Sequence, residues 1–416
     1  MLIKASPPPS SATYHHPPQP PKQLLSHRFE TPSAVTMSNA GRTLPQDLIT
    51  DNILSRLSVK SLCRFKCVSP LWKSIISDPR FAKTHPNRTK TKNSNYPEQK
   101  IIFIFPPGYL TSMDYNDVNP TFTKLEFPTE EQHDAKIVLW LRVLSSCDGL
   151  LLVYRCYKSI FLLNPSTREL KKPPVCLFVQ NSNMHVVYGV GYDSSTDDYK
   201  VVMLSSSYYD QSGTTSVAMY SLKTNAWRRS EDFQGIVRNS GGVFLNGCLH
   251  FLSWNGNVFN RFITAFDLSG EIFKEIPLPT SLVTCEYRYD DYYDLLVLGG
   301  SLCLVSAKEN KVCMMKEYGV RESWTEFTMC SDSSELFLLD GVSMLAEDEF
   351  LLFHVNCVYG EKQLVVYLQL VVYNPQKLTK RDIAICGIPC ATVRYGGTYV
   401  ESLVSPFHAG GIGRKL

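Results

Sequence analysis

The side chains of this chain best suited to chemistry are its nine histidines and thirteen cysteines. Cys63 and Cys67 lie four residues apart, as do Cys386 and Cys390, a spacing without the CxxC pairs and companion histidines of a four-ligand zinc site. His250 and His354 lie in apolar, strand-like runs, where a hydrogen-bonded core histidine is the simpler expectation. We therefore expect no metal site, no cofactor, and reduced thiols that pack as small apolar side chains.

Sequence motifs of the common enzyme classes are also missing. The chain has no HExxH, no Walker phosphate loop and no GxSxG elbow, and Gly189-Val190-Gly191 lacks the third glycine of a dinucleotide-binding loop. Asp193 and the Asp197-Asp198 pair are predicted to form turns by accepting local backbone N–H groups. We predict that the chain has no catalytic site and that it acts by binding.

Composition narrows the class of partner. Lys and Arg number 42 against 39 Asp and Glu, and the net charge of +3 argues against nucleic acid or an acidic membrane surface as the ligand. No apolar run approaches the roughly 20 residues of a membrane span. Eight of the 25 prolines lie in residues 1–42, which we predict to be disordered. This segment is either a natural extension, or translation can start at Met37 and residues 1–36 precede that start. We expect a cytoplasmic or nuclear protein.

Residues 44–85 predict three short helices with more apolar surface than they can bury among themselves. The first begins at Pro45 and places Ile49, Ile53, Leu54 and Leu57 on one face, and the second covers about 59–67. Ser69-Pro70 starts the third, whose apolar stripe ends before Asp78-Pro79. So small a unit is marginal alone and needs a partner; the alternative is a generic three-helix domain with its stripes buried internally.

This segment resembles the F-box, which docks a substrate receptor onto the Skp-type adaptor of a cullin–RING ubiquitin ligase. The resemblance covers Leu44-Pro45, Ile53-Leu54, VKSL at 59–62, CRFKCVS at 63–69 and SDPRFAKTH at 77–85, with Ser58 in place of the usual proline. It implies the following adaptor-facing residues: Leu44, Pro45, Ile53, Leu54, Leu57, Val59, Leu62, Phe65, Val68 and Trp72.

From about residue 100 the apolar pattern changes to that of short strands, such as KIIFIF at 100–105 and YKVVML at 199–204. A strand–turn–strand unit recurs five times, with Asn164, Ser221, Asp267, Tyr318 and Asn374 at equivalent turn positions, 57, 46, 51 and 56 residues apart. That period fits a four-stranded propeller blade, and a β-sandwich is the alternative. We predict an all-β propeller of about six blades.

The same region resembles the F-box-associated, kelch-like domain of plant F-box proteins. The motifs include SCDGLLLV (146–153), LLNPSTRELKKPP (162–174), GVGYDSSTDDYKVV (189–202) and YVESLVSP (399–406). The predicted domains are a disordered extension (1–42), an F-box (43–85), a polar linker (86–99), a kelch-like propeller (100–406) and a tail (407–416). KIIFIF and YVESLV at 399–404 are predicted to pair in one blade, which closes the ring.

The two resemblances imply a substrate-recognition subunit of an SCF-type ubiquitin ligase that reaches cullin and RING subunits through the adaptor and holds an unknown protein target on the propeller. The alternatives are an adaptor-binding protein that builds no active ligase, and a propeller enzyme or lectin with a vestigial box. Strand order predicts short turns on one side of the propeller and long connections on the other. We expect the long connections to bind the target or else to be solvated connectors, and the candidate side chains on them are Tyr208, Tyr209, Trp254, Tyr287, Tyr289, Tyr292 and Tyr293.

Overall fold

The structure is a computed structural model. It describes residues 45–88, 99–105, 109–114, 121–125, 141–155, 159–178, 184–207, 213–237, 241–254, 261–283, 293–306, 309, 311–329, 337–346, 349–359, 364–383, 394–407 and 414–415. None of the helices among these residues combines the length and the apolar composition needed to cross a membrane.

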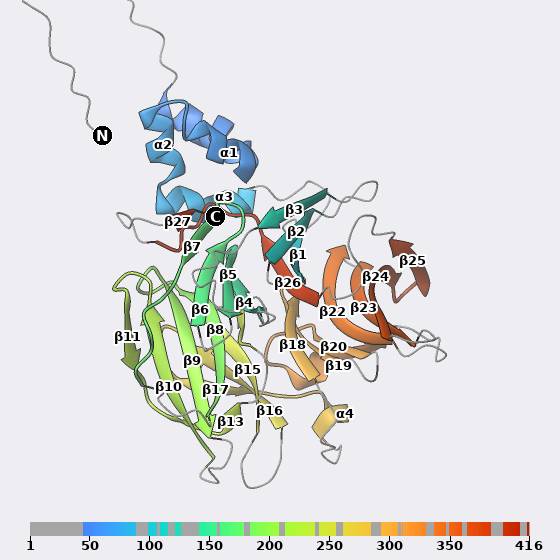
Figure 1. Cartoon of the computed structure of the whole chain (residues 1–416). Helices are drawn as coiled ribbons and strands as arrows, with labels where there is room; N and C mark the ends of the chain where they lie inside the picture. The colour runs from blue at the N-terminus through green and yellow to red at the C-terminus, as the bar shows by residue number, and fades with distance from the viewer. Residues whose placement is uncertain are drawn as a thin grey trace, which may run out of the picture. The chain divides into compact units, whose positions relative to one another are not determined.

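The N-terminal part of the described chain is helical (Figure 1). Its elements are η1 (Leu48–Ile53), η2 (Leu54–Arg56), α1 (Val59–Phe65), α2 (Pro70–Ile76) and α3 (Pro79–Arg88). The helix predicted from Pro45 is present but irregular, because η1 is a π-helical turn and η2 a 3₁₀ turn. Side-chain hydroxyls compete for the backbone carbonyls here: Ser55 Oγ donates to Asp51 O at 2.5 Å, and Thr50 Oγ1 donates to Gln46 O at 3.0 Å. The sequence pattern missed α3, which extends the helical region to Arg88.

Serine caps begin the next two helices. Ser69 Oγ accepts the Trp72 N–H at 3.1 Å, with Pro70 in the first turn, as the sequence predicts. Ser58 Oγ accepts the Ser61 N–H at 3.3 Å at the start of α1. Ser58 stands where the F-box usually has a proline. Its hydroxyl caps α1, which a proline side chain could not do.

The rest of the described chain forms six antiparallel sheets, the blades of a propeller (Figure 1). Blade 1 contains β26 (Arg394–Val400), β1 (Gln99–Phe105), β2 (Tyr109–Asp114) and β3 (Thr121–Leu125). Blade 2 contains β4 (Arg142–Cys147), β5 (Leu150–Arg155), β6 (Ser159–Asn164) and β7 (Glu169–Lys171), with β27 (Arg414–Lys415) added at its edge. Blade 3 contains β8 (Met184–Asp193), β9 (Asp198–Ser207), β10 (Thr214–Ser221) and β11 (Ala226–Arg229), with β12 (Phe233–Gln234) paired to β10.

Blades 4 to 6 complete the ring. Blade 4 contains β13 (Ile236–Val237), β14 (Val243–Leu245), β15 (Cys248–Trp254), β16 (Arg261–Asp267) and β17 (Phe273–Ile276). After a turn of helix, α4 (Thr280–Val283), blade 5 contains β18 (Tyr293–Leu298), β19 (Ser301–Ser306), β20 (Lys311–Met315) and β21 (Trp324–Thr328), with the 3₁₀ turn η3 (Arg321–Ser323) before β21. Blade 6 contains β22 (Phe337–Ala346), β23 (Glu349–Tyr359), β24 (Leu364–Asn374) and β25 (Thr379–Ile383).

The five repeated turns predicted from the sequence all join the third and fourth strands of a blade, which confirms their equivalence. Polar side chains close three of them in the same way. Asn164 Oδ1 accepts the Ser166 N–H at 2.8 Å, Asp267 Oδ1 accepts the Ser269 N–H at 3.0 Å, and Asn374 Oδ1 accepts the Gln376 N–H at 3.1 Å. A short-range hydrogen bond therefore fixes the same turn in blades 2, 4 and 6.

Ring closure uses the predicted strand at 100–105, but its partner begins earlier than the predicted run at 399–404. Only Tyr399 and Val400 of that run belong to the pairing strand, and residues 401–404 follow its end. β26 pairs antiparallel with β1, and Lys100 lies opposite Tyr399 (Figure 1). Tyr399 Oη and Ser112 Oγ lie 2.8 Å apart, and Asn164 Nδ2 donates to Val404 O at 2.7 Å. Blade 1 is therefore built from both ends of the propeller, so no inner sheet edge stays open there.

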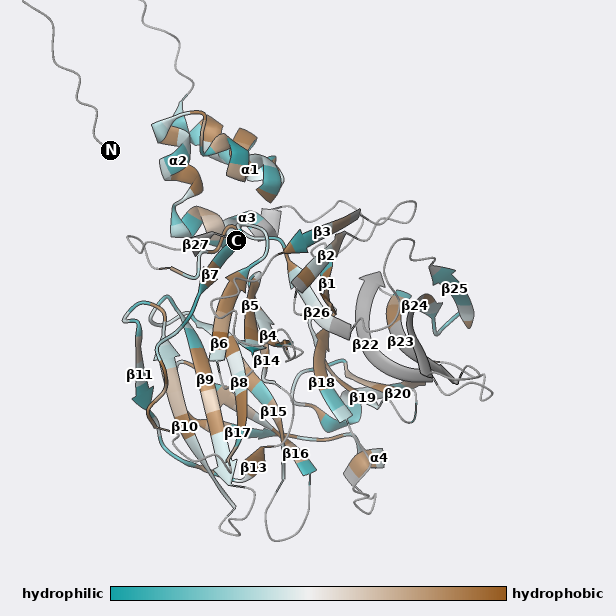
Figure 2. Cartoon of the chain, viewed as in Figure 1, coloured by the Kyte–Doolittle hydropathy of each residue, from teal (hydrophilic) through white to brown (hydrophobic). Residues whose placement is uncertain are grey.

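The core lies between and within the blades. Figure 2 shows hydrophobic residues along inner strands such as β5, β8 and β18, and hydrophilic residues on the outer strands β11 and β25. Two tryptophans on outer strands fasten neighbouring blades, since Trp227 Nε1 donates to Pro174 O at 2.7 Å and Trp324 Nε1 donates to Pro277 O at 2.9 Å. Each proline carbonyl belongs to the segment that leaves the preceding blade.

Candidate functional site

The helical region presents several large apolar side chains to solvent. The exposed fractions are 45% for Leu48, 36% for Ile53, 62% for Val68 and 46% for Leu71, and Pro45 is exposed as well. All of them lie in or beside η1 and α2. Exposed apolar side chains gathered on so few residues are typical of a protein–protein contact surface.

The ten predicted adaptor-facing residues separate into three groups. Leu54, Val59 and Leu62 are at most 2% exposed and belong to the core of the helical region, so they are core residues and not surface residues. Leu57, Phe65 and Trp72 are half-buried against that core, with the Phe65 and Trp72 ring centroids 5.2 Å apart. Pro45, Ile53 and Val68 are exposed. Leu44 lies outside the described residues.

Two exposed residues were absent from the predicted set. Leu71 belongs to the apolar stripe of the third helix, and Leu48 precedes Ile49 on the first. Both stripes could be recognised from the sequence. Which side of each stripe faces inward depends on how the helices pack against one another, because an apolar stripe can be buried internally or left for a partner.

Helix α3 connects the helical region to blade 3. Lys83 Nζ forms an ion pair with Asp197 in the turn between β8 and β9, and it lies 3.8 Å from the centroid of the Tyr192 ring. The hydrogen bond from Lys83 lowers the pKa of the Asp197 carboxyl to about 2. On the same helix, His85 Nε2 donates to Leu57 O at 2.7 Å. The buried side chains of the helical region and of blades 2 and 3 form one apolar cluster.

Asp193 and Asp198, predicted as local turn formers, make wider contacts. Asp193 Oδ1 accepts the Ser195 N–H at 2.9 Å, as predicted, while its Oδ2 accepts from the buried Lys200 Nζ at 2.6 Å. Burial opposes ionisation of Asp193, but the hydrogen bonds from Lys200 and its neighbours hold the pKa of this carboxyl well below its usual range. Asp198 accepts from Ser221 Oγ and from the Lys223 N–H across blade 3. These charges stabilise the propeller.

Strand order divides the loops of the propeller between two sides, largely as predicted, although the eight-residue connection from β20 to β21 is on the side of the short turns. The turns at 194–197, 222–225, 246–247 and 268–272 join first to second or third to fourth strands, and we call the side that carries them the short-turn face. The connections between β7 and β8, β9 and β10, β15 and β16, α4 and β18, and β23 and β24 lie on the opposite side, the long-loop face. The Asp197 turn that Lys83 contacts belongs to the short-turn face.

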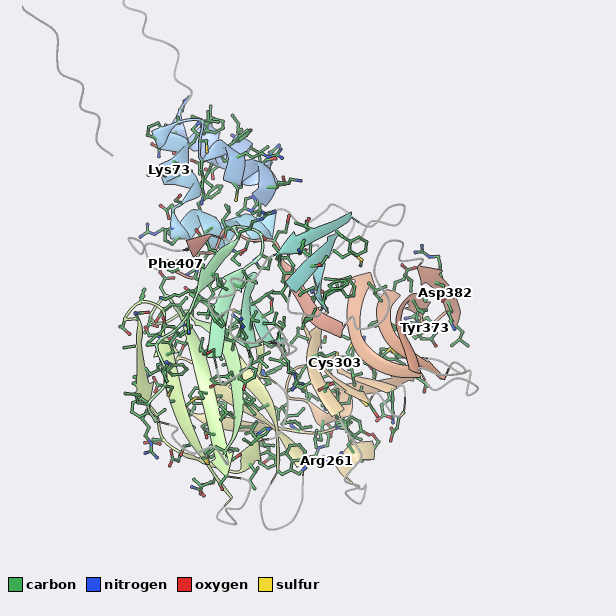
Figure 3. The ribbon with its side chains drawn as sticks, in the orientation of Figure 1. Lys73, Arg261, Cys303, Tyr373, Asp382 and Phe407 are labelled. Carbon is green, nitrogen blue, oxygen red and sulfur yellow. The ribbon has the colours of Figure 1, made fainter. Side chains whose placement is uncertain are left out.

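The predicted target-facing aromatic residues are only partly described. Tyr208, Tyr209, Tyr287, Tyr289 and Tyr292 lie outside the described residues. Trp254 is half-buried against the core shared by blades 4 and 5. Tyr293 was predicted at the surface, but it is 9% exposed. The guanidinium carbon of Arg261, which is labelled in Figure 3, lies 5.5 Å from the centroid of the Tyr293 ring. Tyr293 is the first residue of an inner strand and packs between blades, so it is a core residue.

Two further findings concern metal and thiol chemistry. The described part of the chain contains no group of three or more His, Cys, Asp or Glu side chains placed to hold a metal ion. Cys147, Cys248, Cys303 and Cys313 are buried free thiols, and burial raises the pKa of the Cys303 thiol to about 12 (Figure 3). A thiol that stays protonated is a poor nucleophile, so these side chains act as core residues.

Comparison with known proteins adds family evidence. Residues 107–406 match the F-box associated beta propeller domain, and residues 43–84 match the F-box domain. The F-box/kelch-repeat protein At3g23880 of Arabidopsis thaliana is 29% identical over 335 residues, which cover 76% of this chain and 88% of that protein. F-box protein CPR1 of the same plant is 29% identical over 311 residues, which cover 68% and 72%. Among solved structures, TolB from Acinetobacter baumannii matches 77% of this chain and 71% of its own at 11% identity, with a TM-score of 0.42 that is too low to support an argument.

Proposed function

This chain belongs to the F-box proteins that carry an F-box associated β-propeller domain, and on that premise we propose that it is the substrate-recognition subunit of an SCF-type cullin–RING E3 ubiquitin ligase. Its F-box binds a Skp-type adaptor, which connects it to the cullin and RING subunits. The propeller, whose blades we take to be kelch-like because of the Gly241-Gly242 pair, holds the target protein. We propose no catalytic role for the chain, and we expect it to act in the cytoplasm or the nucleus.

The observation that carries this proposal is the exposed apolar surface of the F-box. Leu48, Ile53, Val68 and Leu71 are each 36% or more exposed in a helical unit of about 40 residues. Burying such side chains against a partner contributes roughly 25 cal/mol for each Å² of apolar surface removed from water. The half-buried Leu57, Phe65 and Trp72 support this surface from beneath. The ligase would then accelerate ubiquitin transfer by proximity, because the target is held near the charged conjugating enzyme.

Charge substitutions on this surface test adaptor binding. Leu71→Asp and Val68→Asp place a carboxylate in the proposed interface, and we expect adaptor pull-down to fall at least a hundredfold because an unpaired buried charge costs several kcal/mol. Leu378→Asp is the matched control, since Leu378 is a 77% exposed apolar residue on a turn of blade 6. Melting temperatures should not change in any of the three. Wild-type adaptor capture by Leu71→Asp and Val68→Asp would refute this interface.

A charge at Leu57 or Trp72 is a less specific test. Both side chains pack against the helical core, so Leu57→Asp should abolish adaptor binding partly by unfolding the F-box. The propeller should remain folded in this variant, because four of its apolar clusters contain no residue of the helical region. Circular dichroism of the variant separates the loss of the F-box helices from the loss of the surface alone.

We propose that the target binds the long-loop face. The support is that the F-box helices contact the short-turn face through Lys83 and Asp197, which leaves the other face available. The proposed target-binding residues are Tyr208, Tyr209, Tyr287, Tyr289 and Tyr292, which come between strands in the sequence, and Trp254 at the end of β15. Because Tyr293 is a core residue, it drops out of the proposed set. Replacing Tyr287, Tyr289 and Tyr292 by serine should spare adaptor binding and slow target depletion.

Two experiments identify the complex and the target. Co-purification of the cullin with the tagged chain distinguishes a ligase subunit from a protein that binds the adaptor alone. Proximity labelling with and without proteasome inhibition reveals proteins that accumulate near the chain only when degradation stops. A tyrosine variant that still depletes such a protein at the normal rate would move recognition to another surface.

A further inference from the structure

Two innermost strands of the propeller carry a charged residue at their start. Arg142 is the first residue of β4 in blade 2, and Asp294 is the second residue of β18 in blade 5. Both are exposed, whereas Tyr293 and Leu295, on either side of Asp294, are buried. The two charged side chains therefore leave the packed interfaces between blades.

Strand direction places both residues at the same side of the propeller. β4 ends at the short turn 148–149 and β18 ends at the short turn 299–300. Their first residues consequently lie toward the long-loop face. Blades 2 and 5 are three positions apart in a ring of six, so Arg142 and Asp294 start strands on opposite sides of the propeller axis.

The two charges interact without neutralising each other. Among the described residues, the side chains of Arg142 and Asp294 form no hydrogen bond or ion pair, although both backbones are paired within their sheets. Desolvation raises the pKa of the Asp294 carboxyl, and the positive charge of Arg142 opposes that shift. In contrast, the buried Lys200 and Asp193 of blade 3 are in direct contact, with Nζ and Oδ2 at 2.6 Å. Both charged groups are exposed, so each is accessible to a group of opposite charge on a ligand.

A hydrogen-bond network holds β4 in place close to Arg142. Ser145 Oγ donates to Gly242 O at 2.6 Å and accepts the Val190 N–H at 3.1 Å, while the Gly242 N–H donates to Tyr188 O at 2.8 Å. The innermost strands of blades 2, 3 and 4 are thus joined three residues beyond Arg142. A rigid support of this kind pre-organises a binding group and reduces the entropy lost on binding.

We propose that these strand ends bind a polypeptide segment of the target, with an acidic side chain of the segment on Arg142 and a basic side chain on Asp294. This inference rests on the proposed function and specifies the chemistry recognised on the long-loop face. Charge complementarity defines the occupant: a planar guanidinium suits a carboxylate, and a carboxyl suits an ammonium or guanidinium group. A segment that spans the axis can satisfy both groups at once.

Fluorescence anisotropy with synthetic peptides tests the site on the full chain. The probes are fluorescein-labelled peptides in which Glu and Lys are separated by zero, two or four glycines, with Gln and Met replacing Glu and Lys in the neutral analogues. We expect at least one charged peptide to bind at least tenfold more tightly than its neutral analogue. Arg142→Glu and Asp294→Lys should each weaken that binding at least tenfold. The double exchange Arg142→Asp with Asp294→Arg should restore it, because the peptide can bind in the reverse direction.

Lys377→Glu is the matched control. This substitution changes the net charge by the same amount as Arg142→Glu, but Lys377 lies in a turn of the short-turn face. Peptide binding by the Lys377→Glu variant should therefore be unchanged. Binding of no charged peptide, or equal binding to wild type and to both single variants, would overturn the proposal. Displacement of the peptide by an equal concentration of 6-aminohexanoate would also overturn it, in favour of a small zwitterionic ligand. Adaptor pull-down with the same proteins tests the proposed function separately, since none of these substitutions lies in the F-box.

Discussion

At the residue scale, His250 illustrates how the propeller treats a polar side chain in its core. The sequence predicted a satisfied core histidine, and the structure confirms it. The side chain is fully buried, Nδ1 donates to Val243 O at 3.1 Å, and Nε2 accepts from Tyr318 Oη at 2.7 Å. The pKa of His250 falls to about 4 because burial disfavours the charged imidazolium. The other strand histidine, His354, has its side chain outside the described residues.

His250 should make the propeller acid-sensitive. The unfolded chain binds the proton near pH 6.5 and the folded chain near pH 4, so acid favours unfolding as the pH falls between these values. The full loss is about 3 kcal/mol at 1.36 kcal/mol for each pH unit, and about 2 kcal/mol is lost by pH 5. Urea unfolding of wild type and His250→Gln at pH 5 and pH 7.5 measures it. Between pH 7.5 and pH 5, wild type should lose about 2 kcal/mol more free energy of unfolding than His250→Gln. An equal loss in the two proteins would contradict this role of His250.

At the element scale, the double glycine of blade 4 shows what the innermost strands require. A Cβ on Gly241 would lie 1.8 Å from the backbone oxygen of Leu144, and one on Gly242 would lie 2.5 Å from the Phe251 ring. The strands of blades 2, 3 and 4 can therefore approach one another only because these positions have no side chain. This close approach explains why two glycines stand together at 241–242.

Gly241→Ala should destabilise the propeller strongly. The clash is with backbone, which cannot rotate away, and overpacking of this kind costs about 3 kcal/mol. Gly270→Ala is the control, because a Cβ there meets its nearest neighbour, Ile272, at an ordinary 3.6 Å. Thermal unfolding should place the Gly241 variant several degrees below both wild type and the Gly270 variant. Equal melting temperatures for the two variants would refute the packing argument.

At the scale of the whole molecule, the propeller depends on joining its two ends. β26 supplies the innermost strand of blade 1, and the segment after it is bonded to the Asn164 turn of blade 2 through Ser402 O and Val404 O. The same region of blades 2 and 3 packs against the F-box helices. The segment that closes the ring and the F-box helices therefore pack against the same apolar core.

Truncation after residue 398 tests closure. It removes Tyr399, Val400 and the strand-to-turn bonds of Asn164, and it leaves the edge of β1 partly unpaired. We expect aggregation and a melting temperature lower by several degrees, because an unpaired edge recruits other chains. Truncation after residue 407, which keeps β26 and these bonds, is the control. An unchanged melting temperature for the shorter protein would count against the shared blade.

The sequence alone determined the features that arise from local physical chemistry. Strand periodicity and the recurring strand–turn–strand unit predicted a propeller of about six blades, the order of strands predicted its two faces, and Ser69-Pro70 located the start of a helix. Each depends on residues a few positions apart. Only the tertiary structure decided that Leu54, Val59, Leu62 and Tyr293 are buried and that Leu48 and Leu71 are exposed. It also placed Arg142 opposite Asp294. These properties depend on which distant segments pack together, and an apolar stripe or an isolated charge has the same sequence pattern whether it faces the core or a partner.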